Sequence, residues 1–313
     1  MPLIVPSSAS LPVHDTLASE RVLIIDQSRA EHQQIRPLRI GLLNLMPASV
    51  REQTEIQFFR LLGNTPLQIE PVLIRFDEFI PNTGKERMEI FYEQFGEVKT
   101  KGLDGLIVTG ANLETKEDGS LLNFEEIHFV EEWKKILSWA QEYVTSTIYS
   151  CLGSHFALEY FYDLKRDLSA QKIFGVFDHT LDRESHPEFL QGMNDIVPVP
   201  HSRWGDIAVE KITNKDLEVV AQNPDCGWHM IIGRNGREVY LQGHPEYDRE
   251  DLVGEYLRDK EHGQAMPQNY FPDNDETKLP LCNWKADGSV FYRNWVNHVY
   301  QTTGYDTSKP FMD

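Results

Sequence analysis

Short apolar runs alternate along the chain with segments in which apolar side chains recur at helical spacing. The run at 39–45 predicts a buried strand, and Ile56, Phe59 and Leu62 mark the buried face of a helix expected at 52–62. The same patterns predict strands at 67–76, 105–109 and 146–150 and helices at 86–95 and 123–139. Because strands and helices alternate, we expect an α/β fold with a mostly parallel sheet flanked by helices.

The second half of the chain adds a β-hairpin to this pattern. Its strands are predicted at 228–233 and 238–241, joined by a turn at Asn235-Gly236. Further predictions are a strand at 173–179, a helix from 248 to about 260 and a final amphipathic segment at 291–300.

Two local signals follow the strand predicted at 105–109. The polar segment 112–122 follows it and is predicted as a loop on the ligand-binding edge of the sheet. Asn123, with Glu126 three residues later, has the spacing of a capping box for the long helix that ends near Trp139. We expect one α/β domain at 35–313 after an N-terminal extension at 1–34, because no repeat or low-complexity linker divides the 313 residues.

The charge balance restricts the partners of the chain. It has 30 Lys and Arg against 49 Asp and Glu, a formal net charge of −19. Such a charge repels nucleic acid and anionic membranes, so neither is expected as a partner. A phosphorylated ligand would have to be captured locally.

The three cysteines, Cys151, Cys226 and Cys282, indicate neither a disulfide framework nor a metal site. They are widely separated, odd in number and lack the C-x-x-C spacing of zinc sites. We therefore expect no metal and no bound cofactor. The first 21 residues are interrupted by prolines and charges, and no run of about twenty apolar residues occurs. These features favour a cytoplasmic location.

Cys151 stands at the turn between the strand predicted at 146–150 and an apolar helix pattern. A side chain at such a turn projects from the sheet above the free N–H groups of the helix, which favour a thiolate and can stabilise an oxyanion. Gly153 permits the close backbone approach that the turn needs. Most free cysteines are small core residues, but this position favours a nucleophile, with the elbow geometry known from hydrolases.

A thiol nucleophile needs a base, and His244 with Glu246 can supply it. Residues two apart on an extended segment point to the same side, and Pro245 stiffens the segment between them. The carboxylate can then orient the imidazole and stabilise its protonated form. His155 is a rival base, but its place four residues after Cys151 directs it along the helix.

Eight motifs in order resemble the homoserine O-acyltransferase family of methionine biosynthesis, often called homoserine O-succinyltransferases. They are 35–40 (IRPLRI), 43–47 (LNLMP), 59–68 (FRLLGNTPLQ), 104–111 (DGLIVTGA), 200–203 (PHSR), 243–248 (GHPEYD), 269–272 (NYFP) and 294–297 (NWVN). The resemblance covers most of the chain. It implies a flavodoxin-like fold of the class I glutamine amidotransferase type.

The resemblance also implies site residues. In this family Cys151 would form the acyl-thioester intermediate, His244 would accept the proton and Glu246 would complete the triad. Family substrate-binding positions fall on Lys172, Ser202 and Arg258. Acyl-CoA, either acetyl-CoA or succinyl-CoA, is implied as a co-substrate, and a homodimer as the assembly.

Four positions depart from the family pattern or distinguish members that use different acyl groups. Glu114 falls where a glutamate goes with acetyl and a glycine with succinyl, so acetyl is favoured, because a carboxylate there would repel that of a succinyl group. After Pro47 the chain lacks a lysine that many members carry, for which Arg51 is a candidate substitute. Leu152 and His155 replace the more usual tryptophan and glutamine beside the nucleophile.

Together, the motifs and the resemblance predict a ping-pong transfer of an acyl group from acyl-CoA through Cys151 to the hydroxyl of L-homoserine. The changed residues beside Cys151 leave L-serine or another hydroxy amino acid open as the acceptor. A glutamine amidotransferase-like hydrolase and a non-catalytic regulatory relative are two further hypotheses that the sequence leaves open.

Overall fold

The computed structural model describes residues 3–5, 13–19, 24–27, 36–63, 65–263 and 265–304. Most of the predicted extension at 1–34 lies outside the described residues. Its described strands β1 (Leu3–Val5) and β2 (Ile24–Asp26) pair with each other, and β1 also pairs with β4 of the main sheet. The division of the chain at residue 35 stays a prediction.

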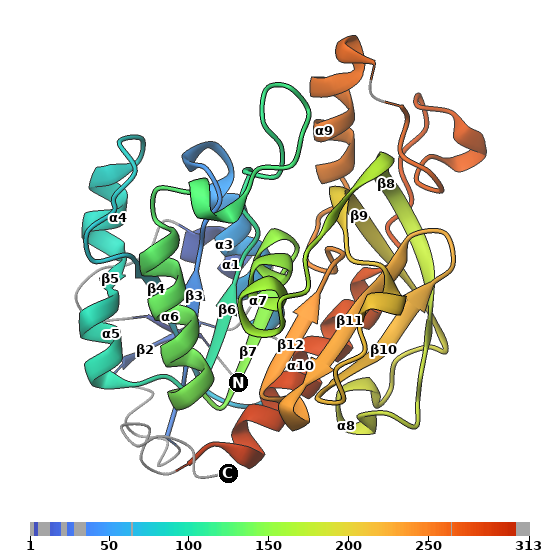
Figure 1. Cartoon of the computed structure of the whole chain (residues 1–313). Coiled ribbons are helices and arrows are strands. Elements are labelled where there is room, and N and C mark those ends of the chain that lie inside the picture. Colours follow the sequence, from blue (N-terminus) through green and yellow to red (C-terminus); the bar gives the residue numbers. More distant parts are fainter. Residues whose placement is uncertain are drawn as a thin grey trace.

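Among the residues that the structure describes, twelve strands form one sheet at the centre of the molecule (Figure 1). The strands up to β7, together with β12, pair in parallel, and the remaining strands pair in antiparallel fashion. The parallel core is β4 (Ile69–Arg75), β3 (Leu38–Leu43), β6 (Gly105–Val108), β7 (Ser146–Ser150) and β12 (Glu238–Leu241), with the short β5 (Glu93–Gln94) beside β4. The predicted mostly parallel sheet is therefore confirmed.

The antiparallel part of the sheet extends it beyond β12. Its order is β11 (Gly227–Gly233), β10 (Leu217–Asn223), β8 (Asp167–Leu181) and β9 (Ile196–Asp206). The hairpin between β11 and β12 turns where expected, with Asn235 at φ 55° and Gly236 at φ 86°. The length of β8 and the strands β9 and β10 were not predicted.

Helices cover both faces of the sheet, as expected (Figure 1). One apolar cluster joins the sheet to α1 (Val13–Ser19), α3 (Ala48–Leu62), α8 (Pro187–Leu190) and α10 (Lys285–Thr302). The other joins the opposite face to α5 (Phe95–Lys101), α6 (Val130–Tyr143) and α7 (Leu152–Tyr162). Met88 of α4 (Lys85–Phe91) also belongs to the first cluster, and Leu252 and Tyr256 of α9 (Asp251–Asp259) pack against β8 in a third cluster.

The capping box predicted for a helix from 123 caps a shorter element. The Asn123 side chain accepts from the backbone N–H of Glu125 at 3.0 Å, and the turn it starts is a 3-10 helix, Phe124–Glu126. The α-helix α6 begins only at Val130 and ends at Tyr143. The prediction of one continuous helix was wrong. Within the described part of the chain, no helix is long and apolar enough to cross a membrane.

Candidate active site

Cys151 lies between the end of β7 and the start of α7, as the sequence predicted. Its backbone has φ 49° and ψ −118°, a conformation that non-glycine residues rarely adopt and that is often found at functional sites. Its N–H donates to the carbonyl of Leu241 at 2.7 Å, which ties the turn to β12. The side chain is half-buried.

Two glycines leave room for this turn. A Cβ atom at Gly153 would lie 2.7 Å from the carbonyl oxygen of Thr109, so α7 can approach β6 only with glycine at that position. A Cβ atom at Gly110 would lie 3.7 Å from Cys151 Sγ and 3.5 Å from the backbone nitrogen of Leu152. Glycine there keeps open the space between the thiol and the first N–H of α7.

His244 and Glu246 follow β12, which lies next to β7 in the sheet. Leu241 pairs with Ser150 in parallel register, so the segments that leave the two strands emerge side by side. The backbone N–H of His244 donates to the carbonyl of Pro200 at 2.8 Å, and its ring Nδ1 lies 2.7 Å from Oε1 of Glu246. The ring is also hydrogen-bonded to the Cys151 side chain. The structure thus brings together the three residues predicted as a triad.

The electrostatics of His244 favour the protonated imidazole. Burial lowers the pKa of His244, but the negative charges of Cys151 and Glu246 and hydrogen bonds to both outweigh it, and the pKa lies well above the ordinary value. The ring also stacks on Tyr247, with centroids 4.1 Å apart. The ring therefore lies between two acidic side chains that favour its protonated form.

Two of the three predicted substrate-binding residues meet at a residue that the sequence did not single out. Lys172 Nζ lies 3.3 Å from Oε2 of Glu255, and the Ser202 hydroxyl donates to the same oxygen. The other oxygen of Glu255 accepts from Tyr247 at 3.2 Å. Glu255 was missed because a glutamate on the amphipathic helix α9 has the pattern of an ordinary solvated residue.

Arg258, the third predicted substrate-binding residue, lies on the same helix but faces solvent. Its side chain is 61% exposed and makes two hydrogen bonds to Asp259, at 2.6 and 2.5 Å. The hydrogen bond to Asp259 and the charges of Asp259 and Glu255 raise its pKa. The structure therefore does not bring Arg258 into contact with Lys172 or Ser202.

Glu114 lies in the loop after β6, as predicted, and contacts β9. Its Oε1 accepts from the backbone N–H of Gly205 at 2.5 Å. Its charge acts on two buried arginines, Arg166 and Arg203, and both also respond to the charge of Cys151. Glu114 and Cys151 thus act on the same two arginines. Arg51 was the candidate substitute for the lysine that many family members carry after Pro47. Its guanidinium lies against Gly84, at the start of α4.

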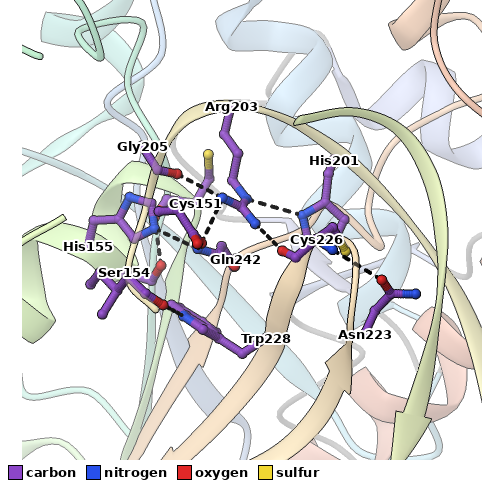
Figure 2. Close-up of polar contacts among 12 residues, drawn as sticks. Cys151, Ser154, His155, His201, Arg203, Gly205, Asn223, Cys226, Trp228 and Gln242 are labelled. Atoms are coloured by element: carbon purple, nitrogen blue, oxygen red, sulfur yellow. Dashed lines mark hydrogen bonds and ion pairs between the residues drawn. The ribbon is translucent and has the colours of Figure 1, made fainter. Parts of the chain in front are cut away.

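A buried polar network extends from the base of α7 to the antiparallel strands (Figure 2). Arg203 is fully buried, and its Nη1 donates to Asp206 at 2.9 Å and to the carbonyl of Gly205 at 2.8 Å. The Gln242 amide nitrogen lies 3.0 Å both from Asp206 and from Nε2 of His155. Burial and the charges of Arg166 and Arg203 hold the pKa of His155 well below its ordinary value. His155 is therefore neutral and is a poor rival to His244 as a base.

One group of described residues has the composition of a metal site. Ligand atoms of His179, His201 and Cys226 all lie within 4.8 Å of one another. However, Arg203 donates to Nδ1 of His201 at 3.4 Å and to the backbone carbonyl of Cys226. A divalent cation would lie beside this buried guanidinium and be repelled by it. Burial also raises the pKa of Cys226 to about 12, so the thiol stays protonated.

Comparisons with known proteins identify the family. The model of the family described as homoserine O-succinyltransferase matches residues 2–305. The chain is 42% identical to the homoserine O-succinyltransferase of Pseudoalteromonas atlantica over 311 residues, which cover 98% of this chain and 97% of the relative. It is 41% identical to that of Proteus mirabilis over the full length of both chains. A homoserine O-acetyltransferase of Lachnoclostridium phytofermentans is 39% identical, covering 95% of this chain and 97% of the relative.

Solved structures support the predicted fold type. A glutamine amidotransferase from Methylobacillus flagellatus superposes with a TM-score of 0.51 at 13% identity, covering 86% of this chain and 94% of the other. At that identity the likeness concerns the fold alone, and it confirms the expected class I glutamine amidotransferase-like architecture. With this fold, and with a family model that matches almost its entire length, the chain belongs to the homoserine O-succinyltransferase family of amino-acid O-acyltransferases.

Proposed function

We propose that this protein transfers an acyl group from acyl-CoA to the hydroxyl of L-homoserine through a thioester on Cys151. The observation that carries the proposal is the hydrogen-bonded series from Cys151 through His244 to Glu246. A nucleophile, a base and a carboxylate that orients the base are the groups that covalent acyl transfer requires. Membership of the family supports homoserine as the acceptor.

In the first half-reaction the Cys151 thiolate attacks the thioester carbonyl of acyl-CoA. The oxyanion that forms can be stabilised by N–H groups at the start of α7, beside the space that Gly110 leaves open. When the tetrahedral intermediate collapses, its carbon–sulfur bond to coenzyme A breaks. The imidazolium of His244 gives its proton to the leaving thiolate, and the acyl group remains on Cys151.

In the second half-reaction the homoserine hydroxyl attacks the acyl-enzyme. His244, now neutral, accepts the hydroxyl proton, and the bond to the Cys151 sulfur breaks to give the O-acyl ester. Glu246 keeps Nδ1 of His244 protonated, so that the other ring nitrogen can exchange protons with the reactants. The Cys151 sulfur is thereby released and His244 again carries the proton, which restores the starting state.

The acceptor amino acid would bind near Glu255, where Lys172 and Ser202 meet. The Glu255 carboxylate can bind an ammonium group. Tyr247 donates a hydrogen bond to Glu255 and stacks on the ring of His244, so the two residues are close to the same side chain. Arg258, three residues further along α9, would supply a cation for the amino-acid carboxylate. In this arrangement Lys172 and Ser202 hold Glu255 in place and add donors for the ligand.

We propose acetyl as the favoured acyl group. The Glu114 carboxylate acts on the same two arginines as Cys151, and it would repel the terminal carboxylate of a succinyl group bound beside them. Relatives bear both names, homoserine O-succinyltransferase and homoserine O-acetyltransferase, so family membership alone leaves the donor open.

The test is a steady-state assay of thiol release with acetyl-CoA and succinyl-CoA, each against L-homoserine and L-serine. We expect turnover with acetyl-CoA and homoserine, and parallel lines in double-reciprocal plots. Cys151→Ser should reduce kcat by at least about a thousandfold, whereas Cys282→Ser, a matched change at a half-buried cysteine of the tail, should not. Turnover with L-serine but not with L-homoserine would make L-serine the acceptor and leave the proposed mechanism unchanged. No thiol release with any pair, in an enzyme that is folded, would overturn the proposal.

A further inference from the structure

The segment that carries His244 leaves the sheet at the end of β12, and its first three backbone N–H groups are all hydrogen-bonded. The N–H of Gln242 donates to the backbone carbonyl of His229, and the N–H of His244 donates to that of Pro200, both at 2.8 Å. Between them, the Gly243 N–H donates to Nδ1 of the His229 side chain at 3.3 Å. A side chain of β11 thus replaces a backbone carbonyl where the pairing of β11 with β12 ends.

This hydrogen bond requires one particular form of His229. Nδ1 can accept only when it is unprotonated, so the proton of the neutral ring lies on Nε2. His229 is 3% exposed, and burial together with the charges of His179 and His244 holds its pKa well below the ordinary value. The ring is therefore neutral near pH 7 and can serve as an acceptor for Gly243.

A second buried histidine, His201, packs against Gly243. A Cβ atom built on Gly243 would lie 2.7 Å from Nε2 of His201 and 2.6 Å from Cγ1 of Val199. His201 is itself held, because Arg203 donates to its Nδ1 at 3.4 Å (Figure 2) and its ring stacks on that of His179, with centroids 5.0 Å apart. The peptide at Gly243 is therefore hydrogen-bonded to one imidazole and packed against another.

The position of Gly243 matters because the next residue is the proposed base. The His244 ring contacts Cys151 and at the same time lies 2.7 Å from Glu246. Without the His229 acceptor, the Gly243 N–H would be buried without a partner, and the peptide would have to rotate to find another. A rotation there displaces the ring of His244, and a displacement of about 1 Å at such a group can slow a reaction about 100-fold.

We propose that His229 is a positioning residue for the proposed base: its Nδ1 holds the Gly243 N–H and thereby keeps the His244 ring between Cys151 and Glu246. His229 acts through the backbone and contacts neither substrate nor reacting atoms. This inference rests on the proposed acyl transfer through Cys151 and His244.

The experiment compares His229→Asn, His229→Gln and His229→Leu in the full chain. The amide oxygen of asparagine can take the position of Nδ1, that of glutamine extends toward the position of Nε2, and leucine has no acceptor. We expect kcat for thiol release to fall about 10- to 100-fold in the Gln and Leu variants and to stay within about threefold in the Asn variant. KM for acyl-CoA should change little, because His229 does not contact the donor.

Histidine NMR titration of His244 gives a second readout that a merely structural role would not move. In the Gln and Leu variants the contacts of His244 with Cys151 and Glu246 are loosened, so its pKa should fall toward the ordinary value. In the Asn variant the pKa should remain raised. The ring nitrogen shifts of His229 in the unmodified protein should also show an unprotonated Nδ1.

His179→Leu is the matched control. His179 is 0% exposed and belongs to the same group of histidines, but its ring contacts the carbonyl of Phe177 and the thiol of Cys226 rather than Gly243. It should lower the melting temperature and leave both kcat and the pKa of His244 unchanged.

An Asn variant no more active than the Gln variant, or unchanged kcat and an unchanged pKa of His244 in the Gln and Leu variants, would overturn the positioning role. If His229→Leu does not fold, the comparison of Asn with Gln decides. Failure of the proposed acyl transfer is distinguishable, because then the unmodified chain would release no thiol, while the His244 titrations would still report the position of the ring.

Discussion

The Nδ1 atom of His244 lies 2.7 Å from Oε1 of Glu246, while the same imidazole is hydrogen-bonded to Cys151 from the neighbouring strand. The register of the sheet produces this relationship. Ser150 and Leu241 pair with each other and are the last residues of β7 and β12. Pairing of the two strands thus sets the positions of a nucleophile and a base that are 93 residues apart in the sequence.

The charge state of His244 gives the first prediction. Burial lowers the pKa of His244, and the charges of Cys151 and Glu246 raise it further than burial lowers it. Cys151→Ser removes one of these charges and should lower the pKa of His244, and Glu246→Gln should lower it as well. Histidine NMR titrations of the two variants and of the unmodified protein measure this. An unchanged His244 resonance in both variants would mean that the three groups are not coupled.

Replacing Glu255 by Gln tests the acceptor site. The variant keeps the size of the side chain but removes the carboxylate that Lys172 and Ser202 share. We expect KM for homoserine to rise about 10- to 100-fold, because a charge-assisted contact to the ammonium group is lost. Acylation by the donor should remain, as followed by mass spectrometry in the absence of acceptor.

The control for this variant is Glu250→Gln, at an exposed position that precedes α9. It should leave KM for homoserine unchanged. If Glu255→Gln has the same KM as the unmodified protein and lowers only the melting temperature, Glu255 has a structural role and the proposed acceptor site is wrong.

The turn that carries Cys151 depends on Gly153. In Gly153→Ala the new methyl group would meet the Thr109 carbonyl at 2.7 Å, so either α7 or β6 must shift. We expect a loss of about 1–3 kcal/mol in the free energy of unfolding, the usual cost of overpacking. The rate of thiol release should fall by more than the loss of folded protein accounts for, because the shift displaces the thiol. Chemical denaturation and thiol release measure the two effects.

Gly254→Ala is the opposite case and serves as the control. Gly254 lies within α9, and nothing lies within 4 Å of a Cβ atom built on it. Alanine there should stabilise the protein by about 0.5–1 kcal/mol through its higher helix propensity. Equal effects of the two substitutions would contradict the proposed close contact at Gly153.

Buried neutral histidines predict acid sensitivity. Burial lowers the pKa of His179 from 6.5 to about 4, and it holds the pKa values of His155, His201 and His229 well below 6.5. At these four histidines the unfolded chain therefore binds more protons than the folded chain below pH 6.5. The stability these residues contribute is present above pH 6.5 and is lost as the pH falls toward 4. Each contributes a slope of up to about 1.4 kcal/mol per pH unit near pH 5.

Urea denaturation at pH 7, 6 and 5 checks this prediction. The free energy of unfolding should fall over this range, although the groups with raised pKa values, His244, Glu55, Glu159 and Asp251, work in the opposite direction. Burial raises the pKa of Asp251 to about 6, so its contribution improves as the pH falls. A flat profile between pH 7 and 5 would show that the histidines are not buried in their neutral form.

Much of the parallel sheet and the position of Cys151 could be predicted from the sequence because they depend on local patterns. The strand predicted at 146–150 has the same bounds in the structure, and Cys151 follows it as expected. His244 and Glu246 could be predicted because they are close together and follow a strand. These signals need no knowledge of long-range contacts.

The antiparallel strands and the second set of polar residues could not be predicted in this way. Arg203 is fully buried in β9, where it pairs with the nearby Asp206 and also donates to the carbonyl of Cys226, 23 residues later, which only the folded sheet brings close. Glu255 gains its partners from β8 and β9, more than 50 residues earlier in the chain. A polar residue at such a position has the local pattern of a solvated one, so its distant partners cannot be recognised from the sequence.

The most direct test of the central claim is intact-protein mass spectrometry after mixing with acetyl-CoA or succinyl-CoA in the absence of an acceptor. The mass should increase by one acyl group, peptide mapping should place that group on Cys151, and addition of L-homoserine should remove it. Cys282→Ser should retain the adduct and Cys151→Ser should lose it. No adduct with either donor, or an adduct that persists in Cys151→Ser, would contradict the account.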